Sequence, residues 1–304
     1  MTAKQAIEIW RMNAFTDQPF SGNPAGVVLD GDSLSDHQMQ LLAPQLNNIS
    51  ETVYVCGSSE PSADLKLRYF TSTTEVDLCG HATISALFAL AASGRLEGKN
   101  ENRIIRAQTR SGVLDLGLEF VDGELVWASM TQPLPEHQLP SAPGQAAAIL
   151  GLDPATIRDD IQIACVSTGI WSCYVPLVDR DALAAISIDY QRIESLWPEN
   201  KEFAGIYPFV ITGGNLQTSS LQTQGRFFCP PKFGIAEDPV TGTASGALAA
   251  YLIRQGAMSA SAELEARQGI EMGSPGQLLV RQTETGAIEI RGQAVSIYRG
   301  HLTV

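Results

Sequence analysis

The chain has 304 residues, about twice the ~150 residues of a typical domain, so two domains or one large domain are expected. Hydrophobic residues make up 44% and charged residues 17%, which supplies a core and excludes a disordered chain. The formal net charge is −13 and the sequence has no basic cluster, so nucleic acid and anionic membranes are not expected partners.

The N-terminal segment 1–15 has no apolar run of signal-peptide length, and the most apolar stretch, 86–92, is far shorter than the ~20 residues that span a bilayer. We therefore expect a cytoplasmic protein. Five cysteines without a C-x-x-C spacing suit a reducing compartment. The four histidines are dispersed, so the sequence indicates no metal-ligand cluster. They are His37, His81, His137 and His301.

The segment 47–55, NNISETVYV, predicts a strand in which Glu51 precedes the apolar run Val53, Tyr54 and Val55. Poor solvation beside these side chains would raise the pKa of the carboxyl group, a property that a general acid/base needs. The competing interpretation is a strand-end glutamate in water.

A second strand signal, 65–70, leads into an irregular loop that ends at Gly80, and a helix is predicted over 80–94. This segment has no Asp, Glu, Lys or Arg, which is typical of a buried helix. His81 lies at its N-terminus, where the helix dipole favours a neutral, hydrogen-bonding imidazole. The competing interpretation is a structural histidine.

The same order of elements recurs in the second half of the chain. The motif RYF at 68–70 corresponds to RFF at 226–228, and the helix 80–94 corresponds to 242–256, with the bounding glycines fourteen residues apart in both halves. Chance similarity of two alanine-rich helices is the competing interpretation. The flanking strand signals also correspond, 47–55 and 65–70 with 203–212 and 221–228.

The expected fold is α+β, with two pseudo-symmetric halves, each a barrel-like, mostly antiparallel sheet around a central buried helix. We expect one domain over 1–130 and a second over 131–304, joined by the Pro- and Ala-rich segment 131–145. Whether the last strand, about 293–304, packs on the second half or on the first is left open.

Each central helix begins at a glycine, Gly80 or Gly242, so ligands can approach its free N–H groups closely. Two such helix ends predict a site for a carboxylate, and hence a small anionic substrate. For Thr243 two interpretations are equally supported: a helix N-cap and a residue that contacts the substrate. Asp238, which precedes Pro239, is a candidate catalytic group, with a turn-forming or capping role as the alternative.

The candidate positions differ between the halves, which predicts an asymmetric site. Cys79 corresponds to Thr241, and a threonine hydroxyl is no base near neutral pH, so a two-thiol racemase is disfavoured. The other correspondences pair Glu51 with Gly205 or a neighbour, His81 with Thr243, and Asp238 with Val76 or Asp77.

Four motifs together resemble the PhzF family, the phenazine-biosynthesis isomerase-like proteins. They occur in the family's order and span nearly the whole chain, and they are far more specific for the family than for one activity within it. The motifs are MNAFTDQPFSGNPAGVVL at 12–29, SETVYV at 50–55, RYFTSTTEVDLCGHAT at 68–83 and GIAEDPVTGTASGALAAYL at 234–252.

The resemblance implies a diaminopimelate-epimerase-like fold with the active site in the cleft, and usually a homodimer. It also implies an isomerase without cofactor or metal, because the family's best-understood member isomerises trans-2,3-dihydro-3-hydroxyanthranilate by moving a proton with a glutamate. By motif that glutamate is Glu51, and His81 and Asp238 hold and polarise the substrate. The N–H groups after Gly80 and Gly242 would bind the carboxylate, and Thr243 stands where the family often has serine.

Three functional hypotheses follow. The first is a cofactor-independent isomerase that moves a proton on a small cyclic or unsaturated amino or carboxylic acid, with Glu51 as general acid/base. The second is an epimerase or racemase that uses Cys79. The third is a metabolite-binding protein that has retained the cleft and lost the chemistry.

Overall fold

The computed structural model describes residues 6–46, 51–197 and 203–303, and the chain divides into two compact units. Unit 1 comprises 1–131 and 291–304, and unit 2 comprises 132–290. The strand predicted over 47–55 is therefore described from Glu51 onward, since 47–50 lie outside the described residues. Within these ranges, every helix is too short or too polar to cross a membrane.

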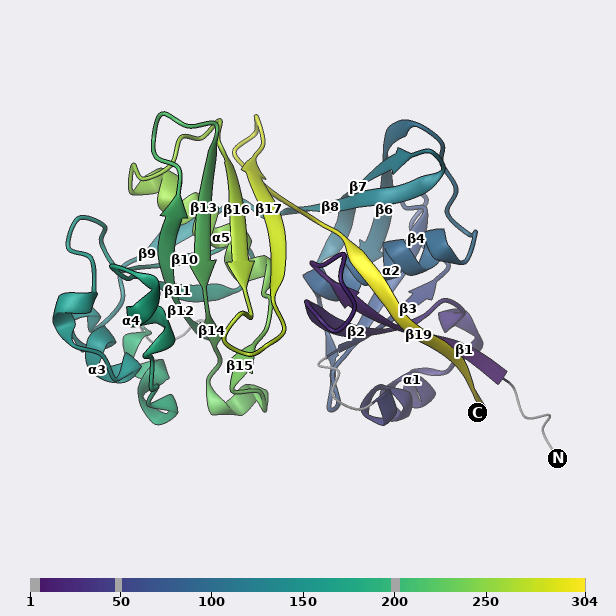
Figure 1. Ribbon diagram of the computed structural model, residues 1–304. Helices are drawn as coiled ribbons and strands as arrows, with labels where there is room; N and C mark the ends of the chain where they lie inside the picture. Colours follow the sequence, from purple (N-terminus) through teal and green to yellow (C-terminus); the bar gives the residue numbers. More distant parts are fainter. Residues whose placement is uncertain (1–5, 47–50, 198–202, 304) are drawn as a thin grey trace. The chain divides into compact units, whose positions relative to one another are not determined.

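Unit 1 is built around helix α2 (Gly80–Ala92), which packs against β1, β2 and β3 (Figure 1). A shorter helix, α1 (Asp36–Leu42), begins with a capping box between Ser35 and Gln38. The strands are β1 (Ala6–Ala14), β2 (Asn23–Val28), β3 (Glu51–Cys56), β4 (Leu65–Phe70), β5 (Glu75–Val76), β6 (Glu101–Thr109), β7 (Gly112–Val121), β8 (Glu124–Gln132) and β19 (Ala294–Thr303).

The last strand belongs to unit 1. β19 pairs antiparallel with β1 from Ala6 opposite Thr303 to Ala14 opposite Ala294, and β1 pairs on its other side with β2. The Phe15 N–H donates to the carbonyl oxygen of Gln293 and extends this contact. Unit 1 is thus closed by both ends of the chain.

Unit 2 is built around helix α5 (Gly242–Arg254), which lies behind β13, β16 and β17 in Figure 1. Two short helices, α3 (Ala146–Leu150) and α4 (Arg180–Ala184), precede it. The strands are β9 (Glu136–Gln138), β10 (Ala164–Ser167), β11 (Trp171–Pro176), β12 (Phe203–Gly213), β13 (Ser220–Gly225), β14 (Phe227–Phe228), β15 (Glu237–Asp238), β16 (Glu263–Gln268), β17 (Gly276–Gln282) and β18 (Ile288–Gly292).

Most strand pairs are antiparallel, as predicted, but parallel pairs occur at corresponding places in both units. They are β2 with β3 and β4 with β6 in unit 1, and β11 with β12 and β13 with β16 in unit 2. Each parallel pair is joined through a helix, because parallel neighbours need a crossover connection. The sequence analysis predicted α2 and α5 but not the directions of the strands that they join, and it missed α1 and α4, which are too short to show helical periodicity.

Matching side-chain contacts confirm the internal repeat. Arg68 forms a bidentate ion pair with Glu75 at 2.8 and 2.9 Å, and Arg226 forms the same pair with Glu237 at 2.8 Å for both bonds. Each guanidinium also lies over the phenylalanine two residues later, at 5.2 Å in unit 1 and 4.7 Å in unit 2. Chance similarity of two helices would not reproduce these contacts.

Both central helices are buried on nearly every side, as predicted from sequences that carry no charge before Arg254. Tyr174 in β11 contacts α5 twice. Its hydroxyl donates to the carbonyl oxygen of Ala244 at 2.7 Å, and its ring stacks on Tyr251 with centroids 5.3 Å apart. The hydrogen bond to Ala244 holds the start of α5, where Gly242 and Thr243 lie, and the ring contact holds its later part.

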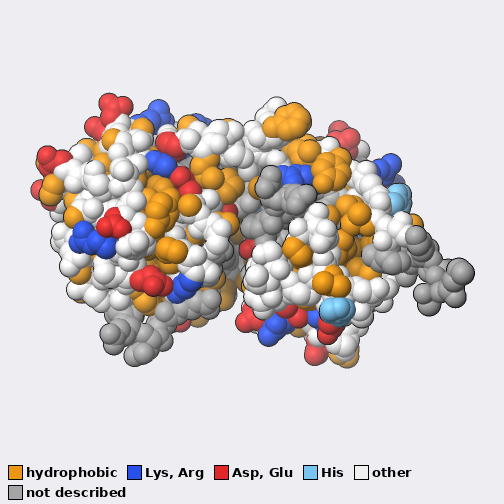
Figure 2. Space-filling view, turned by 90° about the horizontal axis from the view of Figure 1, so that it is seen from below, with side chains coloured by type: hydrophobic (Ala, Val, Ile, Leu, Met, Phe, Trp, Pro, Cys, Tyr) orange, Lys and Arg blue, Asp and Glu red, His pale blue; other side chains and the backbone are white. Residues whose placement is uncertain are grey.

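Acidic and basic side chains are scattered over the face shown in Figure 2, without a concentrated basic patch on that face. This distribution agrees with the low content of Lys and Arg, 20 residues against 33 Asp and Glu. On this face the charge gives no attraction for a polyanion.

Candidate active site

Glu51 is the first residue of β3, at the end of a well-packed strand. β3 lies between β2 and β4, with Ala25 opposite Glu51 and Phe70 opposite Thr52, and the side chains of Val53 and Tyr54 are fully buried. The carboxylate side chain is 22% exposed. The interpretation of Glu51 as a fully solvated strand end is therefore wrong.

His81 is the second residue of α2, and the structure brings it to Glu51. The distance from His81 Nε2 to Glu51 Oε2 is 3.2 Å, and the imidazole side chain is 9% exposed. Cys79, the residue before the helix, is also buried, and its Sγ lies 3.4 Å from Nδ1 of the same ring. Three groups that can exchange protons thus meet where β3 and α2 begin.

The electrostatic environment of this cluster differs from the sequence prediction for His81. Burial raises the pKa of the Cys79 thiol. Burial alone would lower the pKa of His81, but Cys79 and Glu51 together raise it well above its usual value. This direction runs against the neutral imidazole expected from the helix dipole, because Cys79 and Glu51 both lie beside the ring.

The same three residues are the group in the described part of the chain whose atoms could hold a metal ion. One ligand atom from each of Glu51, Cys79 and His81 lies within 4.8 Å of the others. The sequence analysis found no such cluster because it considered histidine spacing alone. The available signal was the close spacing of Cys79 and His81, with Glu51 brought in by the fold.

A second polar cluster lies at the start of α5 in unit 2. The Thr241 hydroxyl donates to Asp238 Oδ2 at 2.5 Å, and Asp238 is 9% exposed. Gln268 connects the two residues, since its Nε2 donates to the Asp238 carbonyl oxygen at 2.6 Å and its Oε1 accepts from the Thr241 N–H at 3.1 Å. Asp238 therefore forms a turn with Thr241, and its carboxylate is held in one orientation.

The sequence analysis missed Gln268. It is the last residue of β16, whose buried positions are Leu264, Ala266 and Gln268, so it shares the inward face of an alternating strand. A polar residue at an inward position of such a pattern was the available signal. Its side chain is 1% exposed and fully used in fixing the Asp238 turn.

Thr243 is the second helical residue of α5, and the N-cap is Thr241, so the capping interpretation of Thr243 is wrong. Gly242, the first helical residue, gives its carbonyl oxygen to Gln132 Nε2 at 3.1 Å. The Gln132 side chain is held in turn by the hydroxyl of Thr168 at 2.7 Å. These contacts fix the backbone that carries Thr243.

The strand register identifies Gly205 as the counterpart of Glu51. Thr52 lies opposite Phe70 in unit 1 and Ile206 lies opposite Phe228 in unit 2, so the preceding residues correspond. A Cβ atom at Gly205 would lie well inside van der Waals contact with the carbonyl oxygen of Phe228. Unit 2 therefore has no room for a carboxylate at this position.

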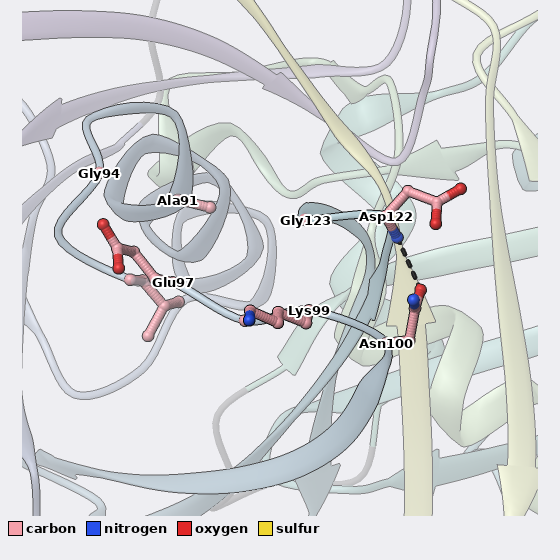
Figure 3. Close-up of a pocket in the computed structure, with 9 residues that line it drawn as sticks. Ala91, Gly94, Glu97, Lys99, Asn100, Asp122 and Gly123 are labelled. Atoms are coloured by element: carbon pink, nitrogen blue, oxygen red, sulfur yellow. Dashed lines mark hydrogen bonds between the residues drawn. The ribbon is translucent and has the colours of Figure 1, made fainter.

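Unit 1 also has a pocket of about 630 Å³ at the other end of α2, and none of Glu51, Cys79 and His81 lines it. Figure 3 shows its charged side chains, with Asn100 accepting from the Asp122 N–H at 2.8 Å. Lys99 and Glu97 are exposed to solvent there. Solvated charges of this kind do not have the burial that tunes catalytic groups.

Comparison with known proteins decides the family. The profile of the phenazine biosynthesis-like protein family, PhzC-PhzF, matches residues 12–300. The chain belongs to the PhzF family. A protein of Bacillus subtilis named uncharacterized isomerase YfhB is 34% identical, and the alignment covers 95% of this chain and 96% of that protein. A crystal structure of a Bacillus anthracis PhzF-family protein superposes with a TM-score of 0.84 at 30% identity, covering 99% of this chain and all of that one.

Among relatives with a named reaction, the trans-2,3-dihydro-3-hydroxyanthranilate isomerase of Pseudomonas aeruginosa is 29% identical over 95% of this chain and 96% of its own length. A probable proline racemase from Agrobacterium radiobacter has a TM-score of 0.63 at 15% identity, covering 97% of this chain and 92% of that one, and this likeness concerns the fold alone. The predicted PhzF membership and the epimerase-like α+β fold are confirmed.

Proposed function

We propose that this PhzF-family protein is an isomerase that moves a proton on a small cyclic or unsaturated amino or carboxylic acid. The observation that carries the proposal is the pair of Glu51 and His81, 3.2 Å apart where β3 and α2 begin. A relative in the same family supports it, since the Pseudomonas aeruginosa protein is named for isomerisation of trans-2,3-dihydro-3-hydroxyanthranilate.

In the proposed reaction, the Glu51 carboxylate accepts a proton from one carbon of the substrate, and the C–H electron pair moves into the adjacent unsaturated system. The carboxyl group of Glu51, which is 22% exposed and can exchange its proton with solvent, then delivers a proton to another carbon, so charge and oxidation state balance. A positioned general acid/base contributes about 10² to 10⁴ in rate, and substrate orientation adds to this. The chemistry requires no cofactor or metal.

Substrate binding is assigned to the remaining predicted residues. His81 carries a raised pKa and is suited to donate a hydrogen bond to a carboxylate. Asp238 is suited to accept from a substrate amino group, and the N–H groups after Gly80 and Gly242 to bind a substrate carboxylate. Thr243 supplies a hydroxyl, and Gln268 is a positioning residue that holds Asp238.

The test is turnover, followed by proton NMR, on a panel that begins with dihydro-hydroxyanthranilate and continues through unsaturated amino and carboxylic acids. The proposal predicts conversion of at least one compound by the wild type and a loss of about 10² to 10⁴ in rate for Glu51→Gln. Tight binding of a compound that survives Glu51→Gln, without conversion by the wild type, would instead support the metabolite-binding hypothesis.

One observation favours the epimerase hypothesis as the second candidate: Cys79 Sγ lies 3.4 Å from His81 Nδ1, within reach of proton transfer. An epimerase of this kind needs the thiol as its base, so Cys79→Ser would abolish turnover and substrate would protect Cys79 from alkylation. The isomerase retains most of its rate in Cys79→Ser. Chiral analysis of the product separates the two reactions directly.

The protein is further proposed to be a cytoplasmic homodimer. The family resemblance supports the dimer, and five buried cysteines that form no disulfide in the described residues suit a reducing compartment. Sedimentation velocity of the full chain tests the dimer, since a monomer at all concentrations would contradict it.

A further inference from the structure

The cluster of Glu51, Cys79 and His81 has a composition that the proposed proton transfer does not require. Glutamate and histidine are sufficient to shuttle a proton and bind a carboxylate, yet the buried thiol of Cys79 completes a set of oxygen, sulfur and nitrogen ligand atoms. Carboxylate, thiolate and imidazole are the three ligand types that Zn²⁺ takes in proteins.

The distances fit a tetrahedral ion. Typical Zn–N, Zn–O and Zn–S bond lengths at a tetrahedral angle place N and O about 3.4 Å apart and N and S about 3.6 Å apart. The measured distances from His81 Nε2 are 3.2 Å to Glu51 Oε2 and 3.8 Å to Cys79 Sγ. These two distances differ by about 0.2 Å from the tetrahedral values, and the third, from Glu51 to Cys79 Sγ, lies within 4.8 Å.

The surroundings also suit such a site. Cys79 and His81 are carried by the rigid start of α2, with exposed fractions of 7% and 8% for the two residues, and Glu51 by the first residue of β3. The carboxylate is 22% exposed and offers an entry from solvent. Three protein ligands leave a fourth position for water, the arrangement of an open zinc site.

We propose that Glu51, Cys79 and His81 bind one thiophilic divalent cation such as Zn²⁺, and that its binding inhibits the enzyme. The metal site itself stands on the geometry of the cluster. The inhibition rests on the proposed function, because a Glu51 carboxylate that ligates a cation cannot carry a proton.

The test uses the full chain without an affinity tag. Calorimetry measures the affinity and stoichiometry of Zn²⁺ binding, and absorption spectroscopy detects the charge-transfer band of Co²⁺ bound to a thiolate. The proposal predicts one ion per chain, a charge-transfer band in the wild type, and a loss of affinity of more than about 100-fold with loss of the band in Cys79→Ser. Cys56→Ser is the matched control, since Cys56 is a buried thiol of the same unit with 8% exposure and lies outside the cluster.

Absence of stoichiometric binding, a band that persists in Cys79→Ser, or a band lost in Cys56→Ser would overturn the metal site. Because absence of binding to the wild type is sufficient to refute the site, the test remains decisive even if a variant fails to fold. His81→Gln serves as a second ligand variant and is expected to weaken Zn²⁺ binding as well.

The inhibition is tested separately by turnover at increasing Zn²⁺, with recovery after chelation. Cys79→Ser should tolerate at least about 100-fold more Zn²⁺ than the wild type. Metal binding without any turnover would refute the proposed function and leave the site standing, whereas turnover that ignores Zn²⁺ would refute the inhibition and leave the isomerase standing.

Discussion

At the scale of single residues, the decisive feature is the short distance between Glu51 and His81. The sequence could place each of them at the start of its own element, because a polar residue before an apolar run and a glycine before an uncharged helix are local signals. It could not show that these two starts meet, since the pairing of β2 with β3 and the packing of α2 on them are long-range contacts. The raised pKa of His81 could not be predicted for the same reason, since Glu51 reaches the ring only through these contacts.

His81 gives the first prediction. Its folded pKa is raised, so the charged form stabilises the native state, fully below the unfolded pKa of about 6.5, and this contribution is lost as pH rises through the folded pKa. The difference in unfolding free energy between wild type and His81→Gln should therefore shrink as pH rises above about 6.5. Urea unfolding over this range measures it.

His137 in β9 supplies the control with the opposite sign. Burial, together with Arg254, lowers the pKa of His137, so its neutral form favours folding. The free-energy difference between wild type and His137→Gln should grow as pH rises through the folded pKa toward about 6.5. The same trend for both histidines would contradict the assignment.

Gly205 gives the second prediction. A methyl group there would collide with the Phe228 carbonyl, so Gly205→Ala should lower the unfolding free energy by about 1–3 kcal/mol. Gly144→Ala is the control, because no atom lies within 4 Å of its added Cβ. Equal unfolding free energies of the two variants in urea would show that unit 2 has room for a side chain at residue 205, contrary to the account.

At the scale of elements, the two central helices are the most predictable part of the fold. The bounds 80–94 and 242–256 exceed those of α2 and α5 by only two residues, because each helix is followed by a glycine in the left-handed region, Gly94 or Gly256. The parallel strand pairs were not predicted. The direction of a strand relative to its neighbour depends on the connection between them, and the residues of the strand itself do not indicate it.

Gln268 gives the prediction at this scale. Gln268→Ala removes the side-chain amide that hydrogen-bonds the Asp238 carbonyl and the Thr241 N–H. Loss of these two hydrogen bonds should lower the unfolding free energy by about 1–3 kcal/mol. If Gln268 positions Asp238 for substrate, KM should rise more than kcat falls. Gln277→Ala on the exposed face of β17 is the control. Unchanged stability and KM in Gln268→Ala would contradict this role.

At the scale of the whole molecule, the chain is an internal repeat in which one half carries a carboxylate at Glu51 and the other has no room for one at Gly205. The repeat, the α+β class and the family could be predicted from the sequence, because the motifs recur in order along nearly the whole chain. The placement of the last strand could not be predicted, because the pattern of 293–304 suits pairing in either half. It is determined by the side of β1 opposite β2, along which β19 pairs.

The C-terminal strand gives the prediction at this scale. A chain that ends at Gly292 lacks β19, which covers the whole length of β1, so unit 1 should lose its cooperative unfolding while unit 2 keeps it. Hydrogen exchange of the truncated chain measures this by amide protection in β1 and β2 compared with β12 and β16. Full protection of β1 would mean that β19 is dispensable.

The most direct test of the central claim is deuterium incorporation in D₂O, followed by NMR, for wild type and Glu51→Gln with the compound that the wild type converts. If Glu51 carries the proton, the wild type should place deuterium at one defined carbon of the product, and Glu51→Gln should slow this exchange by about 10² to 10⁴. Exchange at the wild-type rate in Glu51→Gln would show that another group is the base and would contradict the account.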